Sequence, residues 1–251
     1  MRTAALTRRV ALGAFAALAL AACTPTQPPA APPAPPHPAE QPQAAQQPAP
    51  PQQPNPEADR QLLEAADSGD LAQVRAALAA GANVESRDDD QRTPLVLAAL
   101  ADHVEVAREL VAAGADPNAT DYRQDTAFLV TGVTGSVGML EALLPANPDF
   151  TLLNRYGGTA LIPAGEHGHV EYIRAAVLTG IDVDHVNNLG WTALLEAVVL
   201  GDGSERYQQS VQILVDAGAD VNIRDRNGVT ALQHAEADGY TEIARILRAA
   251  S

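Results

Sequence analysis

Apolar residues recur at helical spacing along the chain from about residue 59 onward. One example is the segment 104–111, with apolar residues at Val104, Ala107, Leu110 and Val111. A second short helix is expected before it, starting at Thr93, whose hydroxyl can accept from backbone N–H groups that otherwise lack partners. Gly114 follows the 104–111 helix, where a left-handed turn favours a residue without a side chain. The pattern predicts pairs of short helices joined by turns.

The helix pair repeats with a fixed period. The anchoring threonine returns every 33 residues and once after 38, at Thr93, Thr126, Thr159, Thr192 and Thr230. We expect each of them to cap its helix. The residues around them also repeat, as in 93–95 (TPL) and 192–194 (TAL), and a Gly-Ala-Asp turn occurs at both 114–116 and 218–220. This period and these recurring residues resemble the ankyrin repeat.

The resemblance covers nearly all of residues 59–251 and implies an all-α solenoid. It predicts about six helix–turn–helix repeats joined by β-hairpin-like loops, at about 59–91, 92–124, 125–157, 158–190, 191–228 and 229–251. The first and last repeats carry more polar residues, as terminal capping repeats do. Repeat three departs from the pattern, with glycines at 132, 135 and 138 and prolines at 145 and 148. Glycine within a helix costs about 0.5–1 kcal/mol relative to alanine, so we predict that repeat three is the least stable and a hinge.

The N-terminal residues 1–23 resemble the signal peptide of a bacterial lipoprotein. Three arginines (Arg2, Arg8 and Arg9) precede an apolar run of 13 residues, 10–22, which is too short to span a bilayer. The run ends in Leu-Ala-Ala-Cys at 20–23, which resembles a lipobox and implies that Cys23 becomes the lipidated N-terminus. An ordinary signal peptide remains the alternative, and the Arg8-Arg9 pair leaves open whether export follows the general secretory or the twin-arginine route.

Residues 24–58 are predicted to be a disordered linker. They hold fourteen of the nineteen prolines, mixed with Ala and Gln, and too few large apolar residues to form a core. Thr24 follows the cysteine in place of the Asp that in many Gram-negative lipoproteins directs retention at the inner membrane. We therefore expect an exported protein on the periplasmic face of the outer membrane, attached to the membrane only through its lipid.

Composition restricts the possible partners. The chain has no lysine, 16 arginines against 31 Asp plus Glu, a formal charge of −15 and a pI near 4.6. This charge argues against nucleic acid, whose phosphates are neutralised by Lys and Arg. The single cysteine cannot form an internal disulfide or a cysteine-based zinc or iron–sulfur site.

Three motifs with possible chemistry are better explained as parts of the repeat. The glycine-rich stretch 132–138 has no lysine after it, as a phosphate-binding loop would need. His167 and His169 have metal-ligand spacing, but Gly168-His169-Val170-Glu171 matches the structural turn of the family. The acidic stretches 88–90 and 201–205 lack an EF-hand pattern. We expect no enzyme, no metal and no cofactor.

In the ankyrin family, partners usually bind the hairpin tips and the inner helices, which form the concave face. Carried over by register, this implies a binding surface at Asp89, Asp90, Arg92, Tyr122, Arg123, Arg155, Tyr156, Trp191 and Arg226. Tyr, Trp and Arg dominate protein interfaces, and Tyr122 and Tyr156 each have an arginine beside them. We therefore predict a monomeric scaffold that binds another envelope or periplasmic protein.

The alternative is a module that binds a small molecule or a cell-wall glycan. Such a ligand would occupy a closed pocket between repeats three and five, near Glu166, Glu196 and the insertion at 201–207.

Overall fold

The computed structural model describes residues 55–251, so the predicted signal peptide, Cys23 and nearly all of the predicted linker lie outside the described residues. The described part contains six successive helix–turn–helix pairs. Their helices are α1 (Pro56–Ser68), α2 (Leu71–Ala79), α3 (Pro94–Leu100), α4 (Val104–Ala112), α5 (Ala127–Thr134), α6 (Val137–Leu143), α7 (Leu161–His167), α8 (Val170–Ala176), α9 (Ala193–Val199), α10 (Glu205–Asp216), α11 (Ala231–Ala237) and α12 (Thr241–Ala249). The predicted all-α solenoid is confirmed.

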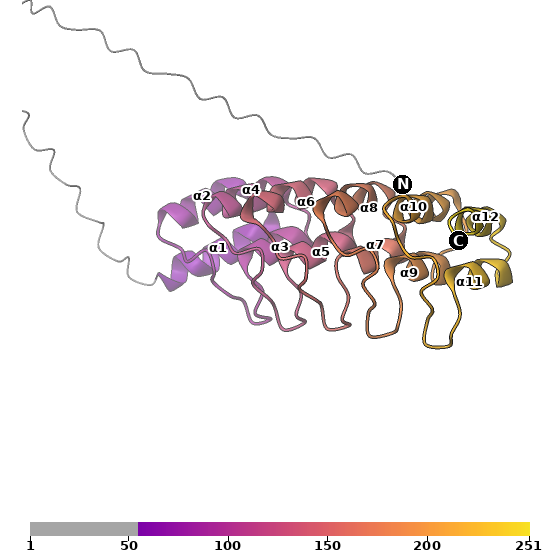
Figure 1. Ribbon diagram of the computed structural model, residues 1–251. Helices are drawn as coiled ribbons and strands as arrows, with labels where there is room; N and C mark the ends of the chain where they lie inside the picture. The colour runs from indigo at the N-terminus through magenta and orange to yellow at the C-terminus, as the bar shows by residue number, and fades with distance from the viewer. Residues whose placement is uncertain (1–54) are drawn as a thin grey trace, which may run out of the picture. The chain divides into compact units, whose positions relative to one another are not determined.

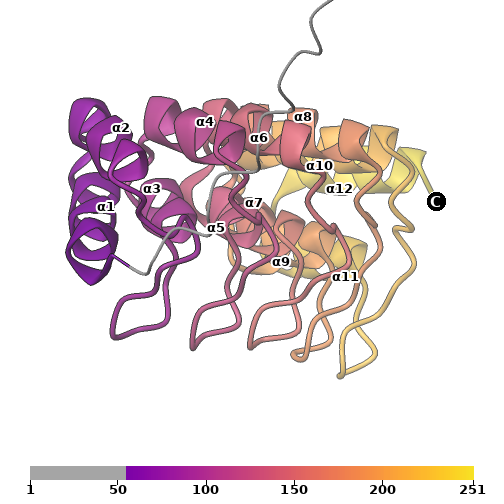
Figure 2. The ribbon, with the colours of Figure 1, turned by 90° about the vertical axis from the view of Figure 1, so that its left-hand side faces the viewer.

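The helices form two rows, and the loops between pairs project past one of them (Figures 1 and 2). Odd-numbered helices, which we call inner helices, lie beside the loops, and even-numbered helices, the outer helices, form the other row. The only strand-like pairing within residues 55–251 is one bridge between Arg224 and Thr230. The core between the rows is built mainly from Ala, Leu, Val and Ile, with few aromatic side chains. Stacked repeats thus bury the apolar faces that a single helix pair would leave exposed.

The first helix begins at Pro56, three residues before the expected start of the repeat domain at 59. Asn55 caps it by accepting from the N–H of Ala58 at 3.3 Å. Pro56 at the first helical position has a fixed φ suited to a helix and no N–H that would need a partner. Proline therefore starts this helix, although proline content suggested that the linker continued through it.

Four of the five anchoring threonines cap their helices as predicted. The hydroxyls of Thr93, Thr126, Thr192 and Thr230 accept from the N–H three residues later at 3.1–3.3 Å. The prediction is wrong for Thr159, whose buried hydroxyl has no partner. Pro163 lacks the N–H that would bond to the Thr159 carbonyl, which accepts from Ile162 at 3.2 Å instead. The first turn of α7 is thereby altered, and the cap is lost.

Gly132, in the middle of α5, has a packing role that its helix propensity does not reveal. A Cβ atom there would collide with the backbone carbonyl of Ala160, at the start of the next inner helix. Gly165 stands one repeat later in α7, and a Cβ atom there would collide with the carbonyl of Ala193. Glycine at these two positions lets α5, α7 and α9 approach closely.

The outer helices of repeats three and four are short. Both α6 and α8 have seven residues and run into 3₁₀ turns, η1 (Leu144–Ala146) and η2 (Val177–Thr179). By comparison α10, which begins within the predicted insertion at 201–207, has twelve residues. Pro145 lies in η1, where it removes an N–H that a continuing helix would use. The reduced stability of repeat three stays a prediction.

Side chains at the start of the outer helices link neighbouring repeats. His103 and His169 bond through Nε2 to the carbonyls of Asp67 and Val133, at 3.0 and 3.1 Å. Later repeats use tyrosine, since the hydroxyls of Tyr207 and Tyr240 donate to the carbonyls of Glu166 and Gly201 at 2.9 and 3.0 Å. The structural role predicted for His169 is confirmed.

Candidate binding surface

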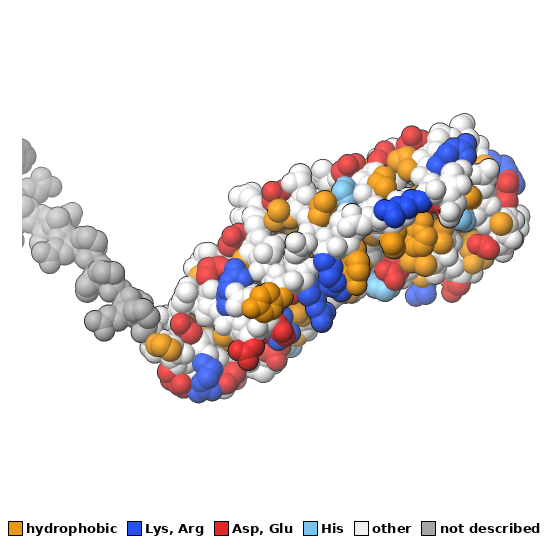
Figure 3. Space-filling view, turned by 90° about the horizontal axis from the view of Figure 1, so that it is seen from below, with side chains coloured by type: hydrophobic (Ala, Val, Ile, Leu, Met, Phe, Trp, Pro, Cys, Tyr) orange, Lys and Arg blue, Asp and Glu red, His pale blue; other side chains and the backbone are white. Residues whose placement is uncertain are grey.

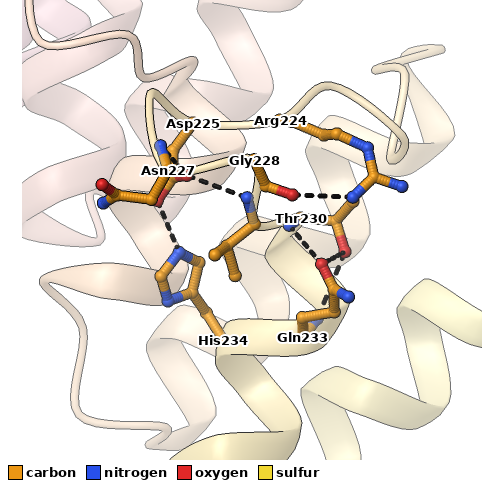
Figure 4. Close-up of polar contacts among 8 residues, drawn as sticks. Arg224, Asp225, Asn227, Gly228, Thr230, Gln233 and His234 are labelled. Carbon is orange, nitrogen blue, oxygen red and sulfur yellow. Dashed lines mark hydrogen bonds and ion pairs between the residues drawn. The ribbon is translucent and has the colours of Figure 1, made fainter.

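An Asp or Asn side chain shapes each hairpin. Its Oδ1 accepts from the backbone N–H groups two and four residues later, at 2.7–3.0 Å. These residues are Asp88, Asp121, Asn154, Asn187 and Asp225, spaced by 33 residues and finally by 38. Figure 4 shows the last of these hairpins, in which His234 of α11 also bonds to Asp225, with 2.9 Å between Nε2 and Oδ2. Each of them lies five residues before an anchoring threonine, so the series has the same spacing as the threonines.

Backbone hydrogen bonds join successive hairpin tips. The N–H of Tyr122 donates to the carbonyl of Asp90 at 3.2 Å, and that of Arg155 to the carbonyl of Arg123 at 3.3 Å. Asn188 N–H continues the series to the carbonyl of Tyr156 at 2.9 Å. We call the tips and the adjoining side of the inner helices the hairpin face, which Figure 3 views from the tips. These bonds hold the side chains of the hairpin face at fixed spacing.

Three successive tips present a large exposed side chain. Tyr122 is 72% exposed, Tyr156 is 56% exposed and Leu189 is 53% exposed. The guanidinium of Arg155 lies 4.4 Å from the centroid of the Tyr156 ring and donates to its hydroxyl at 3.0 Å. Arg155 also forms an ion pair with Asp125, at 3.6 Å. A residue that is exposed yet held in place in this way loses little entropy when a partner covers it.

The other predicted contact residues fall into two groups. Asp89, Asp90 and Arg123 are exposed on the tips. Arg92 and Arg226 are engaged within the chain, because Arg92 pairs with Asp88 at 2.7 Å and Arg226 donates to the carbonyl of Asn188.

Trp191 differs from the other aromatic residues of the series, because it is partly buried and packs against the core. Its replacement would therefore disturb the fold as well as the surface.

Two hollows lie between the tips and the inner helices. The smaller one, about 190 Å³, brings together four of the predicted residues, Asp90, Arg92, Tyr122 and Arg123. The larger one, about 390 Å³, is lined by Arg155 and Tyr156 of the predicted set and by Glu166 and Glu196. We call the larger hollow the Glu196 pocket. Asp89, Trp191 and Arg226 line neither hollow.

Glu196 is a buried acid at this pocket. Its side chain, on α9, belongs to a residue that is only 3% exposed, and Oε1 accepts from Asn187 Nδ2 at 2.8 Å. Burial raises the pKa of Glu196 to about 7, opposed by the Asn187 hydrogen bond and reinforced by the nearby charge of Glu166. A carboxyl group with this pKa is partly protonated at neutral pH.

The pocket lies between repeats three and five, where the sequence placed it for the alternative function. Its walls include Ile162 and Leu200, whereas the insertion at 201–207 does not line it. Exposed Tyr156, Leu189 and Leu200 stand at its edge, so the pocket opens towards the hairpin face. The expected pocket is therefore present, but it is not closed.

The part of the chain that the structure describes lacks both a candidate metal-binding cluster and a candidate membrane-spanning helix. Residues 55–251 hold no cluster of three or more His, Cys, Asp or Glu side chains placed to bind a metal ion. None of the helices in that range is long and apolar enough to cross a membrane.

Comparison with known proteins gives the same repeat. The family model described as ankyrin repeats (3 copies) matches residues 50–121 and 127–225. A solved ankyrin repeat domain from Acinetobacter baumannii AYE is 45% identical, with a TM-score of 0.73, over 75% of this chain and 96% of that one. The ankyrin repeat domain of Bcl-3, described as a unique member of the IkappaB protein family, is 30% identical with a TM-score of 0.67, over 76% of this chain and 86% of that one.

A curated relative, the putative ankyrin repeat protein YahD of Escherichia coli K12, is 44% identical over 55 residues. That match spans 22% of this chain and only 27% of the relative. The family model and the two solved domains cover far more of the chain, and they agree with the six helix pairs of the structure. The chain belongs to the ankyrin-repeat family.

Proposed function

We propose that this protein is a non-enzymatic scaffold, exported and lipid-anchored in the bacterial cell envelope, which binds another envelope protein on its hairpin face. Ankyrin repeats generally mediate protein–protein interaction and are typically not catalytic. The observation that carries the proposal is the row of exposed Tyr122, Tyr156 and Leu189 on three adjacent tips that backbone bonds hold in register. Interfaces are enriched in such aromatic anchors.

The envelope location rests on the sequence of residues 1–23, with its apolar run and Cys23. Removal of a signal peptide with its three arginines would make the formal charge three units more negative than −15. An anionic membrane surface repels such a domain, and the proline-rich segment would then act as a spacer between lipid and domain.

The location and the partner are tested together by chemical crosslinking in the native cell, followed by mass spectrometry. The comparison is between wild type and Cys23→Ala, with membrane fractionation of both. We expect one dominant envelope protein in the wild-type adduct, and loss of that adduct and of membrane association in Cys23→Ala. A wild-type protein that stays in the cytoplasm would contradict the export proposal.

The binding face is tested by a second comparison in the same assay. Tyr122→Ala combined with Tyr156→Ala removes two exposed anchors that take no part in the core. The matched control is Leu178→Ala, which truncates a side chain that is 83% exposed in η2, at the end of the outer helix α8. We expect the double variant to lose the adduct while the control keeps it. Equal capture by both variants would count against the hairpin face.

The alternative function, binding of a small molecule or cell-wall glycan, is favoured by the Glu196 pocket, which has the volume of a small ligand site. Its open edge and its position among the hairpin tips favour a protein partner instead. Isothermal titration with soluble peptidoglycan fragments distinguishes the two. Saturable binding that Tyr122→Ala, at a tip outside the Glu196 pocket, leaves unchanged would support the alternative.

A further inference from the structure

The Glu196 pocket combines apolar walls with acidic groups. Ile162, Pro163 and Leu200 provide aliphatic surface, and Glu166 and Glu196 provide carboxyl groups. Its volume of about 390 Å³ is at the low end of the range of about 300–1,000 Å³ typical of small-ligand sites. A pocket of this size and composition suits a long side chain with an apolar stem and a polar end.

One carboxylate oxygen of Glu196 has no partner within residues 55–251. Oε1 accepts from Asn187, whereas no donor of the described chain bonds to Oε2 and no arginine or histidine pairs with this acid. Within residues 55–251, the side-chain polar atoms that are fully buried and lack a hydrogen-bond partner are the hydroxyl oxygens of Ser86 and Thr159. Oε2 of Glu196 also lacks a partner but does not belong to this group, so it is not fully buried and can be reached from the pocket. A buried carboxylate without a cation is costly, and a cation entering the pocket would remove that cost.

Two basic side chains, Arg155 and His167, line the pocket without bonding to Glu196. Arg155 is paired with Asp125 at 3.6 Å and lies over the Tyr156 ring. His167 also lines the pocket and stands on α7 beside Glu166. Among the described residues, the structure records no hydrogen bond or ion pair between either side chain and Glu196.

Comparison between the repeats shows that the acid is not needed to hold its hairpin. The corresponding positions in repeats two, three and four carry Leu97, Val130 and Pro163, and those hairpins form the same Asp or Asn bonds. In repeat six, the corresponding His234 bonds to Asp225, with 2.9 Å between Nε2 and Oδ2. Only at Glu196 does this series place a carboxyl group that faces a hollow and lacks a cation.

We propose that the Glu196 pocket receives one cationic side chain, an arginine or a lysine, from the protein bound on the hairpin face. The aliphatic stem of that side chain packs against Ile162 and Leu200, and its charged end bonds to Glu196 Oε2. Charge-assisted hydrogen bonds of this kind are shorter and stronger than hydrogen bonds between neutral groups. The strongly acidic chain, with no lysine, attracts a basic segment. This inference rests on the proposed function and specifies the chemistry of the partner.

The first test uses N-acetyl-arginine amide as a probe, followed by NMR of the full chain. N-acetyl-citrulline amide, which has nearly the same shape but no charge, is the control ligand. We expect saturable shifts at the amides of Ile162, Leu189 and Leu200 with the arginine probe, and binding at least tenfold weaker with citrulline. Equal binding of the two probes, or shifts spread away from the pocket, would overturn the proposal.

The protein variant for this test is Glu196→Gln, because glutamine keeps an oxygen that accepts from Asn187 and removes only the charge. Asp238→Asn is the matched control, since it removes one exposed acid at the end of α11, outside the pocket. Circular dichroism checks that both variants fold. We expect arginine binding at least tenfold weaker in Glu196→Gln and unchanged in Asp238→Asn. Unchanged binding in Glu196→Gln would overturn the proposal.

The second test applies the two variants to crosslinking in the native cell. We expect Glu196→Gln to lower the yield of the partner adduct at least tenfold, and Asp238→Asn to leave it unchanged. If Glu196→Gln captures the partner as well as wild type, the cation pocket is refuted and the scaffold function stands. If wild type captures no protein, the scaffold function fails and this inference fails with it, even where the free arginine probe binds.

Discussion

Replacing Glu196 by Gln should stabilise the protein at alkaline pH, by an amount that the structure allows us to work out. Burial raises the pKa of this carboxyl from its ordinary value of 4.5 to about 7. Because each pKa unit corresponds to about 1.4 kcal/mol, ionising the buried group costs about 3.5 kcal/mol of folding free energy. Water in the open pocket screens part of this cost, so we expect about 2 kcal/mol.

The sign follows from proton binding. Between about pH 4.5 and pH 7 the native protein holds the Glu196 proton more tightly than the unfolded chain does, so stability from this group falls as the pH rises. Its contribution is fully present below pH 4.5 and is lost as the pH passes about 7. Glutamine keeps the hydrogen bond from Asn187 and has no such pH dependence. The stability difference between variant and wild type therefore grows with pH.

The assay is urea unfolding at pH 4.5, 6, 7 and 8.5, followed by circular dichroism and by fluorescence of Trp191. Trp191 is the only tryptophan, and its backbone N–H donates to the Oδ1 of Asn187 at 3.0 Å, so its fluorescence reports on the same hairpin. Other groups near Glu196, which include Glu166, His167 and Arg155, are present in both proteins. Their contributions to the free energy of unfolding therefore largely cancel in the difference between variant and wild type. Asp238→Asn is the control for removing one acid from an acidic chain. A difference between Glu196→Gln and wild type that stays constant from pH 4.5 to pH 8.5 would refute the reasoning.

Three further predictions concern the fold. Gly132→Ala should lower the free energy of unfolding by about 1–3 kcal/mol, because its Cβ atom collides with a backbone carbonyl of the next inner helix. Gly158→Ala should lower it less, because a Cβ atom there would lie 3.4 Å from its nearest neighbour. The midpoints of urea unfolding measure both effects. Thr192→Val should cost about 1 kcal/mol in thermal unfolding, while Thr159→Val should be neutral or stabilising because its hydroxyl bonds to nothing. Hydrogen exchange should be faster in α6 of repeat three than in α10, and equal protection would contradict the predicted weak repeat.

The fold was largely predictable because each repeat is specified by residues that lie close together in the sequence. The threonine spacing predicted the starts of α3, α5, α9 and α11, and Gly114 and Gly218 marked the ends of the outer helices α4 and α10. The loss of the Thr159 cap could also have been predicted, since Pro163 four residues later cannot donate to the threonine carbonyl. Each of these features depends on residues only a few positions apart.

The candidate site was predictable only in part, because its properties depend on neighbouring repeats. The exposure of Tyr122 and Tyr156 follows from their places on the tips, but the partial burial of Trp191 depends on packing against the core. The raised pKa of Glu196 requires its burial beneath one hairpin and the nearness of Glu166 from the preceding repeat. Gly132 looked like a weakness in a helix, and only the position of the next repeat shows why glycine is needed there.

The central claim is that a protein partner lies on the hairpin face, and site-specific photocrosslinking tests it most directly. A photoreactive amino acid is placed at Tyr156, on a tip, or at Arg174, an exposed position on the outer helix α8, and the cells are irradiated. The account predicts a discrete protein adduct from position 156 and none from position 174. An adduct formed from position 174 alone, or equally from both positions, would contradict it.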